Sequence, residues 1–192
     1  MNKEEALKRV KDHLPRRRFE HTLGVAKTAV TLANRFGADP EKAELAAIFH
    51  DIAKYFSNDE LKQTITAHPE LPGHLLNYHP SLWHAPVGAV YVMEQYDIFD
   101  QDILNAITYH TTGRSGMSVL EKVVFLADYI EPGRDFPGVN EVRALAEEDL
   151  DTAVAKALAN TMQFLIGKYQ MIYPYTVDAY NDLIKNTGDR LK

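Results

Sequence analysis

Residues 118–130, SVLEKVVFLADYI, carry the clearest indication of how this chain folds. Ser118 and Glu121 have the spacing of a capping box, in which each side chain accepts a hydrogen bond from the backbone N–H of the other residue at the start of a helix. The apolar residues that follow predict a buried helix that runs to about Ile130. One carboxylate, Asp128, interrupts this apolar run and needs a separate explanation.

Helical signals of the same kind recur along the sequence. Asp39-Pro40 is typical of an N-cap followed by a proline in the first turn, Ser57 and Glu60 form a second capping box, and Gly37 is placed to end a helix. Alternating β-branched runs, which would indicate strands, are absent. The predicted helices cover a segment before Pro15, residues 18–36 and 40–52, a segment after Ser57, and residues 86–96, 100–110, 118–130, 140–148, 151–169 and 176–191.

The segment from His68 to Pro86 is the exception, because it holds four prolines and four histidines. We expect an ordered loop or short turns over a site here. The helices on either side predict one all-α domain over residues 1–192. Its core is expected at about 17–135, with C-terminal helices at about 140–191 packed on it.

Composition excludes several classes of protein. The 192 residues include no cysteine, which excludes a disulfide scaffold, a Cys-ligated zinc site and a thiol nucleophile. The formal net charge is −6, so a nucleic-acid partner is not expected. No run approaches the roughly 18 apolar residues of a membrane span, and the N-terminus lacks the apolar core of a signal peptide. We therefore expect a cytoplasmic protein with no membrane partner.

Histidines and aspartates are the candidates for chemistry. His21 and His110 share apolar helix stripes. His50 ends an apolar run and is followed at once by Asp51, and Asp128 lies inside another apolar run. Taken singly, each has an ordinary explanation, either a core histidine with satisfied hydrogen bonds or an aspartate that caps a helix or accepts an interhelical hydrogen bond. Together, imidazoles and carboxylates without thiolates form the ligand set of one or two borderline-hard metal ions such as Fe, Mn or Co.

A more specific pattern is carried by four segments: residues 50–54, HDIAK; His84 beside a proline-rich stretch; residues 110–113, HTTG; and residues 127–134, ADYIEPGR. With His21 ahead of them, these segments make the chain resemble the HD-domain metal-dependent phosphohydrolases, an all-α superfamily. Within that superfamily the chain resembles the bacterial symmetrical diadenosine tetraphosphatases. The resemblance covers about residues 17–180 and implies a single HD-domain helical bundle.

The resemblance implies a dinuclear metal centre. The implied ligands are His21, His50, Asp51 and Asp128 for one ion, and Asp51, His84 and His110 for the other, with Asp51 as the bridge. We expect iron in both positions, with Mn, Co and Ni as the alternatives.

The resemblance also implies the reaction, which is hydrolysis of diadenosine tetraphosphate to two ADP by a metal-activated water. Asp51 and Lys54 are the expected catalytic residues. Lys54 follows His50 by four residues, which on a helix places both side chains on one face. The expected substrate-binding residues are Lys54, Arg18, Thr111 and Arg134 on the phosphates and His79 near a base.

Other functions stay open at this point. The same metal site suits a nucleoside 5′-monophosphatase or a guanosine tetraphosphate hydrolase, although the number of basic residues favours a polyphosphate. A non-catalytic HD-type nucleotide-binding module is a further alternative, which the complete ligand set disfavours, and a helical interaction protein with structural histidines is another. A tyrosine-rich C-terminal region is expected to pack in the core or in a homodimer contact rather than against substrate. Its members are Tyr169, Tyr173, Tyr175 and Tyr180.

Overall fold

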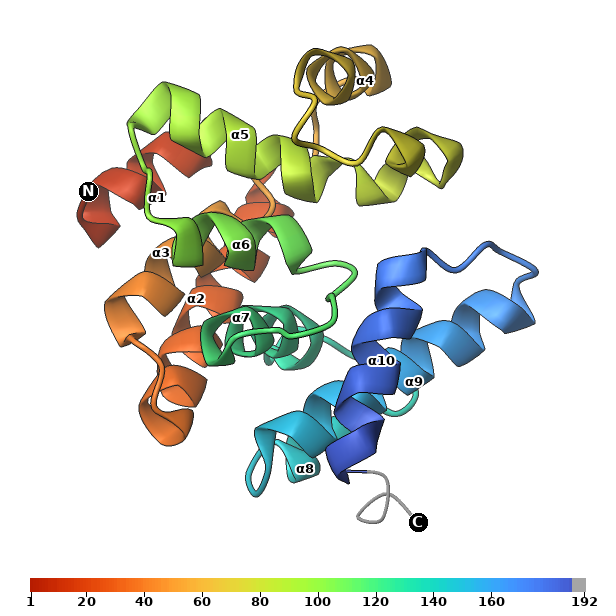
Figure 1. The fold of residues 1–192 in the computed structure, drawn as a ribbon. Coiled ribbons are helices and arrows are strands. Elements are labelled where there is room, and N and C mark those ends of the chain that lie inside the picture. Colours follow the sequence, from red (N-terminus) through yellow and green to blue (C-terminus); the bar gives the residue numbers. More distant parts are fainter. Residues whose placement is uncertain (188–192) are drawn as a thin grey trace.

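The computed structural model describes residues 1–187, and helices form all of the regular structure in this part of the chain (Figure 1). This confirms the all-α prediction. With η marking a 3₁₀ helix, the elements are α1 (Lys3–Lys11), α2 (Arg16–Phe36), α3 (Pro40–Phe49), α4 (Asn58–Ala67), η1 (Gly73–Asn77), η2 (Pro80–Leu82), α5 (His84–Tyr96), α6 (Gln101–Tyr109), α7 (Val119–Ile130), α8 (Val139–Leu145), α9 (Leu150–Gly167) and α10 (Pro174–Thr187).

Capping residues set helix boundaries where the sequence predicted them. Ser57 and Ser118 each accept a hydrogen bond from the N–H three residues on, and Glu60 and Glu121 complete the two capping boxes. α2 ends at Phe36, and the capping residue Gly37 has a φ of 77°, in the left-handed region that favours glycine. These local signals are strong because each of them satisfies backbone groups that a helix end leaves without partners.

Two boundaries differ from the prediction, and both concern candidate ligands. α3 ends at Phe49 rather than near residue 52, because the N–H groups of Ile52 and Lys54 bond to carbonyls three residues back and tighten the chain into turns. α5 begins at His84 rather than at Pro86. Proline is tolerated at the third helical position, since the first N–H groups of a helix have no intrahelical acceptor.

The remaining differences are small. The segment between α4 and α5 contains η1 and η2, which agrees with the expected short turns. α8 is shorter than the predicted 140–148. The helix predicted over 176–191 corresponds to α10, and the end of that prediction, beyond residue 187, lies outside the described residues.

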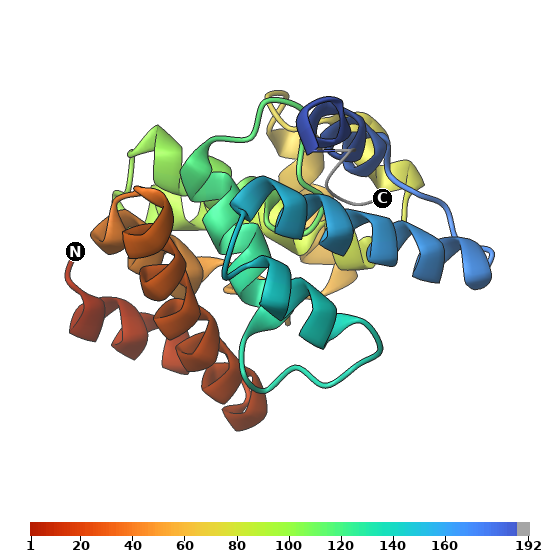
Figure 2. The same cartoon turned by 90° about the horizontal axis from the view of Figure 1, so that it is seen from below.

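α7 lies at the centre of the fold and packs against α2, α3, α6, α8 and α9 (Figures 1 and 2). The main cluster of buried apolar residues draws on helices from α1 to α10. A smaller cluster under η1 and η2 includes Trp83 and Tyr173. Tyr173 is 3% exposed and Tyr180 packs against the main core, as core packing predicts, whereas Tyr169 is 99% exposed. Among residues 1–187, no helix combines the length and apolar character that crossing a membrane requires.

The cap of α7 gives a first prediction. Ser118→Ala removes the acceptor for the Glu121 N–H and is expected to lower the free energy of unfolding by about 1 kcal/mol, measured by urea denaturation. Ser115→Ala, at an exposed position in the preceding turn, is the control and should have little effect. Equal stability of the two variants would show that the cap does not contribute.

Candidate metal centre

Asp51 is the point at which the four predicted histidine ligands meet. Its side chain is 2% exposed, and each of its oxygens faces two imidazoles. Oδ1 lies 3.0 Å from His84 Nε2 and 3.8 Å from His110 Nε2. Oδ2 lies 3.1 Å from His50 Nε2 and 3.9 Å from His21 Nε2. One carboxylate thus divides the four histidines into two pairs.

Asp128, in α7, adds a second carboxylate to the Oδ2 side of this arrangement. Its Oδ1 lies 3.0 Å from His21 Nε2 and 3.9 Å from His50 Nε2. Potential ligand atoms lie within 4.8 Å of one another in three groups: His21, His50 and Asp51; His50, His110 and Asp128; and Asp51, His84 and His110. The cluster could therefore hold a metal ion, and two of these groups share Asp51.

The histidines are oriented by the ends of the helices that carry them. His50 and His110 are the residues that directly follow α3 and α6. Their Nδ1 atoms lie 2.6 Å and 2.8 Å from the carbonyl oxygens of Ala47 and Ile107, which belong to last turns whose carbonyls lack intrahelical donors. His84 Nδ1 lies 2.7 Å from the Ser81 carbonyl. An Nδ1–H donated to a carbonyl leaves the Nε2 lone pair facing the cluster, which is the form that binds metals.

His21 is held differently, by a carboxylate. Its Nδ1 lies 2.9 Å from Glu131 Oε1, and Glu131 Oε2 accepts a hydrogen bond of 2.6 Å from the Gly133 N–H. A Cβ built on Gly24 would lie 2.7 Å from Glu131 Oε2, and one on Gly133 would lie 3.0 Å from both carboxylate oxygens. The two glycines therefore form a slot for the Glu131 carboxylate, and the resulting carboxylate–histidine pair is a common outer partner of metal sites.

The donor atoms fit a bound cation. His21 Nε2 and His50 Nε2 are buried and have no hydrogen-bond partner within residues 1–187. Buried polar atoms are usually hydrogen-bonded, so unpartnered atoms that converge on two carboxylates point to a ligand. Imidazole nitrogens and carboxylate oxygens together suit first-row transition metals.

The electrostatics of the cluster agree with this. Burial alone would raise the pKa of Asp51, but the charge of His50 and the closeness of the other imidazoles to its two oxygens hold that pKa well below its usual range. The pKa of Asp128 is lowered against its burial by the adjacent His21 imidazole and by nearby positive charge. Burial lowers the pKa of His84 to about 4 and also lowers that of His110, so both imidazoles are neutral at neutral pH.

Cationic side chains surround the cluster. Arg18 Nη1 donates to Asp51 Oδ2 at 2.9 Å, and Lys54 Nζ lies 3.6 Å from Asp51 Oδ1 and 3.2 Å from His84 Nε2. Arg134 forms an ion pair with Asp128. Lys54 reaches the cluster from the turn after α3 and not from a helix face, because α3 has already ended.

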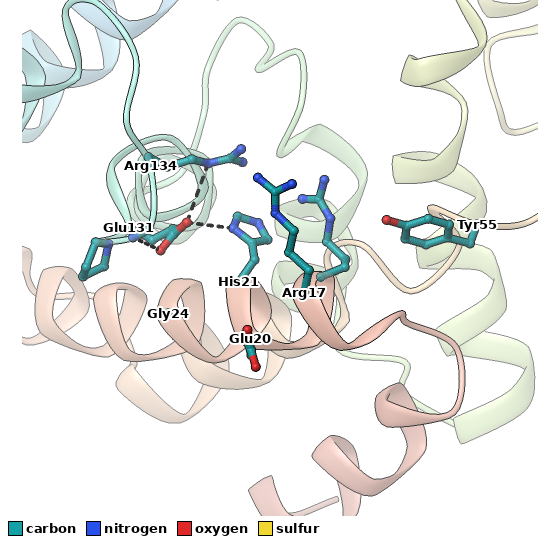
Figure 3. A pocket seen from close by; sticks show the side chains of 10 residues that line it. Arg17, Glu20, His21, Gly24, Tyr55, Glu131 and Arg134 are labelled. Atoms are coloured by element: carbon teal, nitrogen blue, oxygen red, sulfur yellow. Dashed lines mark hydrogen bonds and ion pairs between the residues drawn. The ribbon is translucent and has the colours of Figure 1, made fainter.

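A cavity of about 680 Å³ opens beside His21 and collects most of this positive charge. Figure 3 shows Arg17, at the start of α2, and Arg134, in the loop after α7, extending over His21, with Tyr55 facing them from the other side. Arg18 also lines this cavity. The cavity therefore combines three guanidinium groups with direct access to one candidate ligand.

The candidate His79 and the nearby Arg114 have other partners. His79 is exposed, and its Nδ1 accepts a hydrogen bond from the Ser81 N–H at the start of η2, so it does not join the cluster. Arg114, in the HTTGR stretch, donates to the buried carboxylate of Glu121 at 2.7 Å and lies over the Tyr109 ring. Thr111 does lie beside the cluster, next to His110 and Asp128 in a second cavity.

Sequence reasoning missed three residues of the site. Glu131 stands three residues after Asp128, on a spacing that was available as a signal. Arg143, in α8, donates to the carbonyl oxygens of Ile130, Glu131 and Arg134 and fixes the loop that carries Arg134. Tyr55 directly follows Lys54, but nothing in its local pattern predicts that it lines a cavity.

Comparison with known proteins agrees with this geometry. The family model described as HD domain matches residues 18–133, a range that contains all six candidate ligands. A symmetrical bis(5′-nucleosyl)-tetraphosphatase from Bacillus subtilis is 54% identical over 187 residues, which is 97% of this chain and 100% of that protein. One from Halalkalibacterium halodurans is 51% identical over 184 residues, 96% of this chain and 98% of that protein. The chain belongs to the HD domain family, among the symmetrical bis(5′-nucleosyl)-tetraphosphatases.

A solved structure supports the same placement of this HD-domain chain. A crystal structure of a predicted HD superfamily hydrolase involved in NAD metabolism, from Clostridium acetobutylicum, matches with a TM-score of 0.91 and 38% sequence identity. The match covers 96% of this chain and 98% of the other. The fold described above is therefore shared over almost the whole chain with an HD superfamily hydrolase.

The glycine slot around Glu131 gives a second prediction. Gly24→Ala pushes the Glu131 carboxylate away from His21, and we expect metal affinity to fall by about 10- to 100-fold, measured by metal titration with a competing chelator. Gly73→Ala is the matched control, because no atom lies within 4 Å of the added Cβ. Unchanged affinity in the Gly24 variant would show that the Glu131 contact does not orient His21 for binding.

Proposed function

We propose that this protein is a metal-dependent hydrolase that cleaves diadenosine tetraphosphate symmetrically into two ADP. Water adds across the central P–O–P linkage, so that each half leaves with two phosphates. The observation that carries the proposal is the set of cations, Lys54 and the arginines of the larger cavity, gathered around one buried His/Asp cluster. The names of the relatives from Bacillus subtilis and Halalkalibacterium halodurans support the same substrate class.

The division of histidines by Asp51 supports two ions in this proposal. His21, His50 and Asp128 on the Oδ2 side would hold one, His84 and His110 on the Oδ1 side would hold the other, and Asp51 would bridge them. When bound, such ions supply positive charge on phosphate oxygens and lower the pKa of water. We propose iron as the metal, with Mn, Co and Ni as the alternatives that the same ligands accept.

The protein's own side chains would bind and orient the polyphosphate. Arg18 and Arg134 each stand beside one of the two carboxylates, and Lys54 stands between Asp51 and His84. Guanidinium groups bind phosphate oxygens in a fixed two-point geometry, whereas an ammonium acts as a compact charge. Lys54 is therefore the group proposed to neutralise charge at the reacting phosphate, and the arginines are proposed to hold the chain of phosphates.

Product analysis tests the proposed reaction. Metal-reconstituted protein is incubated with diadenosine tetraphosphate, and the nucleotides are separated by anion-exchange chromatography. We expect ADP alone, because attack at either central phosphorus with loss of the other half gives two identical products. ATP with AMP would contradict symmetrical cleavage, and no cleavage by protein with bound metal would contradict the substrate.

Two variants separate metal binding from phosphate chemistry. Asp51→Ala should lose activity and lower metal content at both positions, because the bridging carboxylate is gone. Lys54→Met should keep its metal and lose about 100-fold in kcat, since it removes a charge beside the reacting group. Lys62→Met, at an exposed position in α4, is the control. Full turnover by the Asp51 variant, or loss of metal from the Lys54 variant, would contradict these roles.

A further inference from the structure

A second cavity, of about 240 Å³, lies against the same cluster and shares Arg134 with the larger one. Its lining residues include His110, Thr111, Asp128, Tyr129, Arg134 and Phe136. They come from the end of α6, from α7 and from the loop that follows α7. Arg134 thus lines both cavities, and each cavity contacts candidate metal ligands.

The two cavities reach the cluster at different residues. His21 lines the larger cavity, and its Nε2 lies 3.9 Å from Asp51 Oδ2. His110 lines the smaller cavity, and its Nε2 lies 3.8 Å from Asp51 Oδ1. Asp128, beside His21, also lines the smaller cavity, and Arg134 lines both cavities. A substrate that reacts at the cluster therefore has room in two adjoining cavities that share Arg134.

The chemistry of the smaller cavity differs from that of the larger one. Arg134 is the one basic side chain among its lining residues, and Asp128 opposes it, so the cavity does not favour a chain of phosphates. The rings of Tyr129 and Phe136 meet edge to face, with centroids 5.0 Å apart and planes at 86°. A planar base in this corner can stack on one ring and present its edge to the other. Thr111 also lines this cavity, and its Oγ1 is buried without a hydrogen-bond partner in the described part of the chain.

We propose that the smaller cavity binds one of the two nucleosides of the substrate, and that Tyr129 and Phe136 stack on its base. The assignment rests on the proposed function, because only a dinucleotide needs a second nucleoside site. The larger cavity, with Tyr55 at 55% exposure and the arginines, takes the other nucleoside and most of the phosphates. This makes the Tyr129–Phe136 corner the feature that distinguishes a dinucleoside polyphosphate from a mononucleotide.

Counting bound ADP tests the proposal without turnover. Equilibrium dialysis of metal-loaded protein against radiolabelled ADP should reach two ADP per chain, one in each cavity. Phe136→Ala should weaken one of these sites by roughly tenfold and leave the other unchanged, since one base–aromatic stack is removed. Phe99→Ala is the matched control, because Phe99 is 67% exposed and lines neither cavity. A plateau of one ADP in the unmodified protein, or two unchanged sites in the Phe136 variant, would overturn the proposal.

A second variant tests the same cavity in case Phe136→Ala weakens ADP binding by destabilising the fold. Thr161, in α9, also lines the smaller cavity, and Thr161→Phe fills it instead of enlarging it. This variant should bind a single ADP, and binding of two would overturn the proposal. The outcome is separable from the test of the reaction. Symmetrical hydrolysis combined with one ADP per chain would contradict only the proposed nucleoside site. Two ADP per chain without hydrolysis would contradict only the proposed reaction.

Discussion

The arrangement of the helices around the site depends on a single buried carboxylate, Asp51. An ionised group that is taken out of water costs several kcal/mol unless other charges and hydrogen bonds compensate it. Here each oxygen of Asp51 faces two imidazoles and one cation, Lys54 at Oδ1 and Arg18 at Oδ2. The compensating groups come from α2, α5, the ends of α3 and α6, and the turn after α3. The helices must therefore pack so that these ends meet, and α7 supplies the common surface on which α2, α3 and α6 do so.

Helix ends provide the precision that such a site requires. A histidine directly after a helix can donate its Nδ1–H to a carbonyl of the last turn, which satisfies a free backbone acceptor and fixes the ring at the same time. His50 and His110 both use this arrangement. The loop after α7 is not held by a helix end. Arg143 fixes it instead, by donating hydrogen bonds to three carbonyl oxygens. Backbone geometry, rather than side-chain packing alone, thus orients much of the cluster.

Features that depend on residues close in the sequence could be predicted from it, whereas features that depend on distant residues could not. Capping boxes at Ser57 and Ser118 are local, so they located helices well, and the pattern of histidines and aspartates led to six side chains that the structure brings together. The contact of Glu131 with His21 spans 110 residues and depends on two glycines that leave space, so the spacing of Glu131 from Asp128 could single out the residue but not its partner. His79 stays a prediction for a base contact, and the structure shows it exposed at the start of η2, where its Nδ1 accepts a hydrogen bond from the Ser81 N–H. The end of α3 was misplaced because the chain tightens there into turns with hydrogen bonds to carbonyls three residues back, which the apolar pattern did not reveal.

The asymmetry of the two cavities has a consequence for a symmetrical substrate. The larger cavity is rich in guanidinium groups, whereas the smaller one offers an aromatic corner and a single arginine. Diadenosine tetraphosphate can enter in two orientations that are chemically identical. Either of its two adenosines can therefore occupy either cavity, even though the cavities differ. Both orientations place the same central linkage at Asp51 and give the same products. A dinucleotide with two different bases lacks this equivalence, and the affinity difference between the cavities would then decide which half lies over Tyr129 and Phe136.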